Sequence, residues 1–129
     1  MCLDTELVNY LLYMTELHLT EQKCEACEGG VAPLTLAEAE TLRAQTPDWH
    51  LSEDGTMLYR EYVCANFVAA LELLNLAGAI AEQEGHHPDL HLTSYKHVRI
   101  ELTTHAIGGL SRNDFIVAAK LDMEYGTNS

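Results

Sequence analysis

The chain has few basic residues. It carries 7 Lys and Arg against 20 Asp and Glu in 129 residues, a formal net charge of −13. Binding of nucleic acid needs a basic face that displaces counterions from phosphates, so we expect no nucleic-acid partner and attribute the acidity to solubility. No apolar run approaches the roughly 20 residues of a membrane-spanning helix, so we expect no membrane partner either.

The sequence indicates neither a leader nor a disulfide framework. No Lys or Arg precedes Lys23, whereas secretory and mitochondrial leaders are basic near their start. Four cysteines are too few to staple a chain of this size. We therefore expect a cytoplasmic protein. Cys24 and Cys27 form a C-x-x-C that supplies only half the ligands of a structural zinc site. We interpret the pair as structural or incidental, with a metal or redox role as the alternative.

The familiar motifs of phosphate-binding and hydrolytic enzymes are missing, but histidine is concentrated in one stretch. There is no Gly-rich phosphate loop, no G-x-S-x-G and no H-E-x-x-H. Five of the seven histidines lie between Glu82 and Asp114. His86 and His87 follow a predicted helix, and His105 stands at the end of a predicted strand. Because imidazole exchanges protons near neutral pH, the pattern predicts acid–base chemistry without a nucleophile.

Apolar periodicity predicts three helices and four strands. A capping box of Thr35 and Glu38 begins a helix that runs to about residue 45. The longest helix covers about 65–84 and stops at Gly85. Ser111 and Asp114 begin the last helix. Hairpins are predicted from 49–52 with 56–63 and from 90–95 with 98–105. We expect an α+β fold: a four-stranded antiparallel sheet with three helices packed on one face, in the order α-β-β-α-β-β-α.

The sequence also predicts which face of the longest helix packs in the core and where the domain begins and ends. The inner stripe of this helix is expected to hold Phe67, Leu71, Leu74, Gly78 and Ala81, flanked by Ala70, Leu73 and Ala77. Residues 24–124 are expected to form one domain, and 125–129 a tail. Residues 1–23 are interpreted as an N-terminal extension that could form a short helix. The alternative is that this segment packs on the domain or on a partner subunit.

The histidine-rich stretch carries a spacing pattern of its own. Glu82 is followed after three residues by His86-His87-Pro88, after six more by Tyr95, and after nine more by His105. Asp114 completes the series. This pattern resembles the signature of the pterin-4a-carbinolamine dehydratases, and the segment from Thr103 to Asp114 resembles a second block of the same family. The resemblance is strongest over 82–122 and does not cover 1–20.

The resemblance implies an enzyme activity. Members of this family dehydrate 4a-hydroxytetrahydrobiopterin to quinonoid dihydropterin during tetrahydrobiopterin recycling. The reaction needs an acid for the leaving 4a-hydroxyl and a base for the N5 proton, and neither step requires a metal or another cofactor. The resemblance also implies the family's four-stranded sheet and a homodimer or homotetramer, with a small-molecule pterin as substrate.

The residues of the site are likewise implied by the resemblance. His86, His87 and His105 would be catalytic, with His87 and His105 nearest the reacting groups. Glu82 would orient an imidazole, unless it only continues the polar stripe of its helix. At Ala106 the chain departs from the acidic residue common in the family. The implied pterin-binding residues are His86, His87, Pro88, Thr104, His105, Ala106 and Ile107.

Simpler interpretations apply to other residues. Asp114 is expected to cap a helix, Tyr95 to pack in a strand, and His91 and His97 to be exposed. Two other functions remain open. The chain could be a non-catalytic interaction or assembly factor of the same fold. A metal site built from the three histidines, with or without Cys24 and Cys27, is disfavoured, because adjacent residues of an extended chain point to opposite sides.

Overall fold

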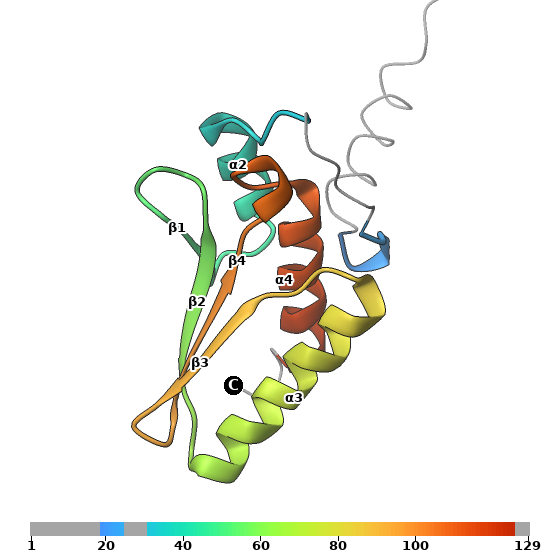
Figure 1. Ribbon diagram of the computed structural model, residues 1–129. Helices are drawn as coiled ribbons and strands as arrows, with labels where there is room; N and C mark the ends of the chain where they lie inside the picture. Colours follow the sequence, from blue (N-terminus) through green and yellow to red (C-terminus); the bar gives the residue numbers. More distant parts are fainter. Residues whose placement is uncertain (1–18, 25–30, 126–129) are drawn as a thin grey trace, which may run out of the picture.

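The computed structural model describes residues 19–24 and 31–125, and it confirms the predicted fold class. Four antiparallel strands form one sheet in the order β1-β2-β4-β3, and the helices lie on one of its faces (Figure 1). The strands are β1 (His50–Leu51), β2 (Leu58–Val63), β3 (Asp89–Thr93) and β4 (His97–Leu102). The helices are α2 (Leu36–Arg43), α3 (Phe67–Glu84) and α4 (Arg112–Tyr125), with the short 3₁₀ helices η1 (Leu19–Glu21) and η2 (His105–Ile107).

Local capping signals set the helix bounds much as predicted. The capping box of Thr35 and Glu38 begins α2, with Glu38 N to Thr35 Oγ1 at 3.2 Å and Thr35 N to Glu38 Oε1 at 2.9 Å. Asn66 caps α3 through a 2.8 Å hydrogen bond from the Ala69 amide. Gly85 ends α3 in the left-handed region, at φ 66°. Because that conformation favours glycine, the end of α3 is fixed one residue before His86.

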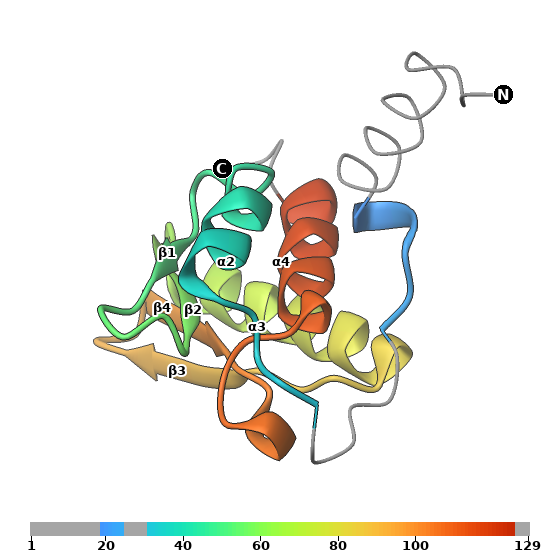
Figure 2. The same ribbon diagram turned by 90° about the horizontal axis from the view of Figure 1, so that it is seen from above.

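The core lies between the inner face of the sheet and α3 and α4. Viewed from above, α3 and α4 lie on the same side of the sheet and contact each other, with α3 passing behind α4 (Figure 2). Helix α4 is buried along most of its length, and Trp49 is fully buried beside it. Leu19 in η1 is 1% exposed and η1 contacts α4. Residues 1–18 of the predicted extension lie outside the described residues. No helix in the part of the chain that the structure describes is long and apolar enough to span a bilayer.

The prediction for the inner face of α3 was partly wrong. Phe67 is 49% exposed and Leu71 is 40% exposed. The sequence of α3 is apolar nearly all round, so several stripes fit a helical period and the packing of α4 decides among them. The stripe that enters the core consists of Ala70, Leu73, Ala77, Ile80 and Ala81.

Two turns also differ from expectation. Tyr95 was predicted to pack in a strand, but it lies in the turn between β3 and β4 with φ 55° and is 59% exposed. Strand β4 ends at Leu102, so His105 is not a strand residue and instead begins η2. His91 and His97 are exposed, as expected.

Candidate active site

Helix α3 delivers the paired histidines to one end of the molecule. After Gly85 the chain turns, and the amide of His86 donates to the carbonyl of Ala81 at 3.1 Å, which continues the helix cap. Pro88 then biases His87 towards an extended backbone, and β3 begins at Asp89. The two imidazoles thus leave the chain from neighbouring positions just beyond a fixed helix end.

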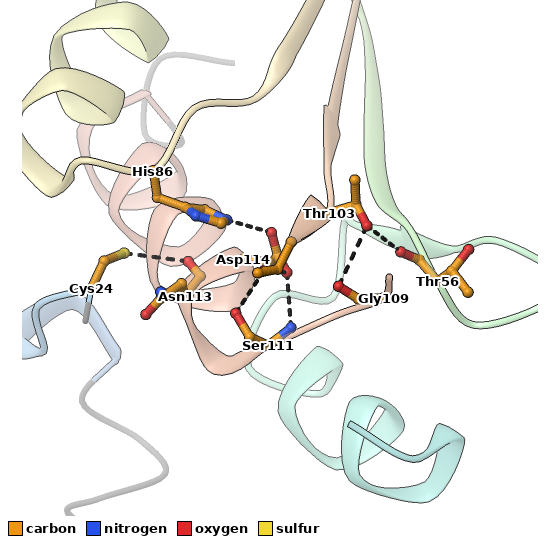
Figure 3. Close-up of polar contacts among 9 residues, drawn as sticks. Cys24, Thr56, His86, Thr103, Gly109, Ser111, Asn113 and Asp114 are labelled. Atoms are coloured by element: carbon orange, nitrogen blue, oxygen red, sulfur yellow. Dashed lines mark hydrogen bonds and ion pairs between the residues drawn. The ribbon is translucent and has the colours of Figure 1, made fainter. Parts of the chain in front are cut away.

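His86 binds a buried carboxylate. Its Nε2 lies 2.6 Å from Oδ1 of Asp114, which is 28 residues further along the chain (Figure 3). The His86 side chain is 12% exposed and the Asp114 side chain is completely buried. The sequence favoured a capping role for Asp114 over a catalytic one and did not predict this contact, although Asp114 belongs to the spacing pattern that begins at Glu82.

Asp114 also caps α4, as predicted. Its Oδ2 accepts from the Ser111 amide at 2.9 Å and from the Thr104 hydroxyl at 2.8 Å. Thr104 Oγ1 in turn lies 2.7 Å from Ser111 Oγ. Three donors therefore converge on one buried carboxylate, an arrangement that satisfies a group able only to accept. Asp114 ties together the segment after α3, the segment after β4 and the start of α4.

The loop that carries His105 is held from both sides. Thr104 is 3% exposed and forms an isolated bridge with Gly109, with the Thr104 amide 2.9 Å from the Gly109 carbonyl. A Cβ added to Gly109 would stand 2.8 Å from the Pro33 side chain, so this close approach needs glycine. Thr103 Oγ1 donates to the Thr56 carbonyl at 2.7 Å (Figure 3). His105, the next residue after Thr104, is itself exposed at the start of η2.

His87 has a different partner. Its Nε2 lies 2.5 Å from Oε2 of Glu82, one turn back on α3, and the two side chains are 62% and 78% exposed. The predicted orienting role of Glu82 therefore has a contact to support it, directed at His87. Solvent competes for exposed pairs of this kind, so we expect the contact to matter for ring orientation more than for stability.

The structure joins some of the predicted site residues and leaves others apart. His86, Asp114 and Thr104 are linked by hydrogen bonds, and His105 follows Thr104 directly. Among the described residues, no hydrogen bond joins His105 to His86 or His87. In the described part of the chain, no three His, Cys, Asp or Glu side chains are grouped so that they could hold a metal ion.

Cys24 contacts the residue that precedes Asp114. Its Sγ is 3.6 Å from the Asn113 carbonyl, and its amide donates to Glu84 Oε1 at 2.9 Å. Burial, reinforced by the negative charge of Glu84, raises the pKa of the Cys24 thiol to about 12. A thiol with this pKa is a poor nucleophile, which supports a structural reading of Cys24; Cys27 lies outside the described residues.

Comparisons with known proteins agree on one family. A family profile described as "Pterin 4 alpha carbinolamine dehydratase" matches residues 32–123. A protein of Rickettsia canadensis named "Putative pterin-4-alpha-carbinolamine dehydratase" is 48% identical over 105 residues, which is 81% of this chain and 94% of that one. A protein of Halorhodospira halophila with the same name is 43% identical over 106 residues, 82% of this chain and 96% of that one.

Two solved structures are similar. The first is described as a transcriptional coactivator/pterin dehydratase from Brucella melitensis. It has a TM-score of 0.63 and 28% identity and covers 70% of this chain and 96% of that chain. The second is a pterin dehydratase-like protein described as a RuBisCO assembly factor of the alpha-carboxysome. Its TM-score is 0.51, with 61% of this chain and 90% of that chain covered, and its 20% identity makes it evidence for the fold alone.

Proposed function

This chain belongs to the pterin 4 alpha carbinolamine dehydratase family, and we propose that it converts 4a-hydroxytetrahydrobiopterin to quinonoid dihydropterin and water, in tetrahydrobiopterin recycling. The observation that carries the proposal is the convergence of the family's spaced residues. His86 and Asp114 bond across 28 residues, and Thr104, the residue before His105, bonds to the same carboxylate.

The reaction needs proton transfer at two points. The C4a–O bond breaks as the hydroxyl takes a proton from an acid and leaves as water. The N5–H electron pair forms the C4a=N5 double bond as a base removes the proton. Imidazoles are suited to both tasks near neutral pH, and each positioned group typically contributes about 10²–10⁴-fold.

We assign the proton transfers to the exposed imidazoles. His87 and His105 are accessible, which a group that meets a substrate must be, whereas His86 is largely enclosed. Glu82 holds Nε2 of His87, so the other ring nitrogen, Nδ1, is directed to the reaction. We propose that the pterin lies against His86, His87, Pro88, Thr104, His105, Ala106 and Ile107.

We also propose that the active protein is a cytoplasmic homodimer or homotetramer. Strand β3 stands at an edge of the sheet, and its Leu90 is 39% exposed. The outward side of α3 exposes Phe67, Val68 and Leu71 by 40% or more. An exposed edge strand and an exposed apolar patch are both features that subunit contacts cover. Cys24 and Cys64 are free thiols, as in proteins of a reducing compartment.

The proposal is tested by following the dehydration of freshly generated 4a-hydroxytetrahydropterin by absorbance. We expect His87→Ala and His105→Ala each to lose on the order of 10²-fold or more in kcat. His91→Ala is the matched control. His91 bonds to Glu101 at 2.9 Å on the face of the sheet away from the helices, so its loss should leave the rate unchanged. Equal rates for all three variants would contradict the assignment. A folded wild-type protein without activity would instead favour an interaction or assembly role.

A further inference from the structure

The bond between Asp114 and His86 has a consequence for the chemistry of the imidazole. We propose that Asp114 is a positioning residue, which keeps the His86 proton on Nε2 and so leaves Nδ1 as the nitrogen that can accept a hydrogen bond. The position of the proton on Nε2 is inferred from the hydrogen bonds of Asp114 alone. Its importance for the rate rests on the dehydratase function proposed above.

The two oxygens of Asp114 have separate tasks. Oδ2 is occupied by the Ser111 amide and the Thr104 hydroxyl, at 2.9 and 2.8 Å. Oδ1 lies 2.6 Å from His86 Nε2. A carboxylate oxygen only accepts, so Nε2 must carry the hydrogen of this bond. Because Asp114 is completely buried, water does not compete for Oδ1.

A proton on Nε2 determines what His86 can do. In the neutral ring the lone pair is on Nδ1, so His86 can accept a proton at that atom but cannot donate one from it. When Nδ1 gains a proton, the imidazolium stands next to the carboxylate of Asp114. His86 can therefore accept a hydrogen bond at Nδ1 in the site, while the two proton transfers stay with His87 and His105.

Asparagine at position 114 should reverse this arrangement. The Ser111 amide can only donate, so it requires an oxygen where Oδ2 now lies. The side-chain oxygen of asparagine would take that place, and its NH₂ group would face His86 Nε2. Since NH₂ only donates, Nε2 would have to accept, and the ring proton would move to Nδ1. Asp114→Asn thus changes the tautomer with almost no change in shape.

The test is ¹⁵N NMR of the imidazoles in protein labelled at histidine, with His86→Ala used to assign the His86 signals. In the neutral ring of wild-type His86, we expect the proton on Nε2 and the lone pair on Nδ1. A wild-type His86 that loses the proton from Nε2, or that exchanges between two tautomers, would overturn the proposal. This measurement needs no variant of Asp114.

Asp114→Asn then tests the cause. We expect its neutral His86 to carry the proton on Nδ1. Asp122→Asn is the matched control, because Asp122 is on the same helix but binds Trp49 and Arg60 and should leave the tautomer unchanged. A folded Asp114→Asn variant that keeps the proton on Nε2 would refute the role of the carboxylate.

The kcat of the Asp114→Asn variant distinguishes a positioning role of Asp114 from a purely structural one. We expect Asp114→Asn to lower kcat as much as His86→Ala does, with KM little changed. A variant with the switched tautomer and an undiminished rate would show that the proton position does not matter for dehydration. A wild-type protein without dehydratase activity would refute the proposed function, while the NMR result on His86 would stand or fall independently.

Discussion

Asp122→Ala should destabilise the fold strongly, because one carboxylate oxygen holds two buried donors. Oδ1 of Asp122 accepts from Trp49 Nε1 and from Arg60, both at 2.8 Å. Trp49 is fully buried, and the Arg60 side chain is 11% exposed. These bonds attach α4, which carries Asp114, to the sheet.

The expected loss can be worked out from the two donors. A buried indole N–H without an acceptor costs about 1–3 kcal/mol. Removing one partner of a buried ion pair costs about 3–5 kcal/mol. The two losses share one acceptor and are not additive, and Asp48 remains 3.7 Å from Arg60, so we expect a total of about 3–5 kcal/mol. That is a large fraction of the about 5–15 kcal/mol by which a domain is usually stable.

The assay is equilibrium unfolding in urea, followed by fluorescence. Trp49 is the single tryptophan of the chain and lies at the affected contact, so it reports the transition without a label. The midpoint should fall while the slope with denaturant stays the same. Asp48→Ala is the control, since Asp48 is 71% exposed and its pair should contribute less than about 1 kcal/mol. Equal losses for the two variants would show that the bonds from Trp49 and Arg60 to Asp122 do not stabilise the fold more than an exposed ion pair does.

Three further outcomes follow from the neighbourhood of the site. Gly85→Ala should cost about 1–2 kcal/mol in thermal unfolding, because the strain is in the backbone at φ 66°, whereas Gly78→Ala inside the same helix should be neutral or stabilising. Desolvation acts to raise the pKa of Glu84, but hydrogen bonds from Lys120 and the Cys24 amide outweigh it and lower that pKa. The folded form is therefore favoured above the ordinary carboxyl pKa and this advantage is lost in acid. The deficit of Glu84→Gln in urea unfolding should thus be large near about pH 7 and shrink below about pH 4, and a deficit independent of pH would contradict this. Cys24, with its raised pKa, should resist iodoacetamide at about pH 8 in the native protein and react once unfolded, as read by peptide mass spectrometry; equal labelling in both states would argue against its burial.

The element order could be predicted because its signals are local. The capping box at Thr35 and the stop at Gly85 involve residues within a few positions of each other, and sheet and helix periods are visible in short windows. The inner face of α3 could not be read in this way. Phe67 and Leu71 fit an apolar stripe as well as Ala70 and Leu73 do, and only the position of α4 decides which stripe is covered.

In the site, too, contacts between residues close in sequence could be predicted, whereas contacts between distant residues could not. The cap formed by Asp114 and Ser111 spans three residues and was predicted. The bond from Asp114 to His86 spans 28 residues and depends on how α3 and α4 pack, so no local pattern showed it. Tyr95 lies in a turn where two successive residues have positive φ, which neither side chain favours and which sequence therefore does not signal. The catalytic roles of His86, His87 and His105 stay predictions.

The proposed function depends above all on whether the wild-type protein accelerates dehydration of 4a-hydroxytetrahydropterin. If the chain is a dehydratase, the absorbance change is faster than the uncatalysed background, in proportion to the protein concentration, and with turnover of more than one substrate per chain. Decay at the background rate in the presence of folded protein would contradict the dehydratase function.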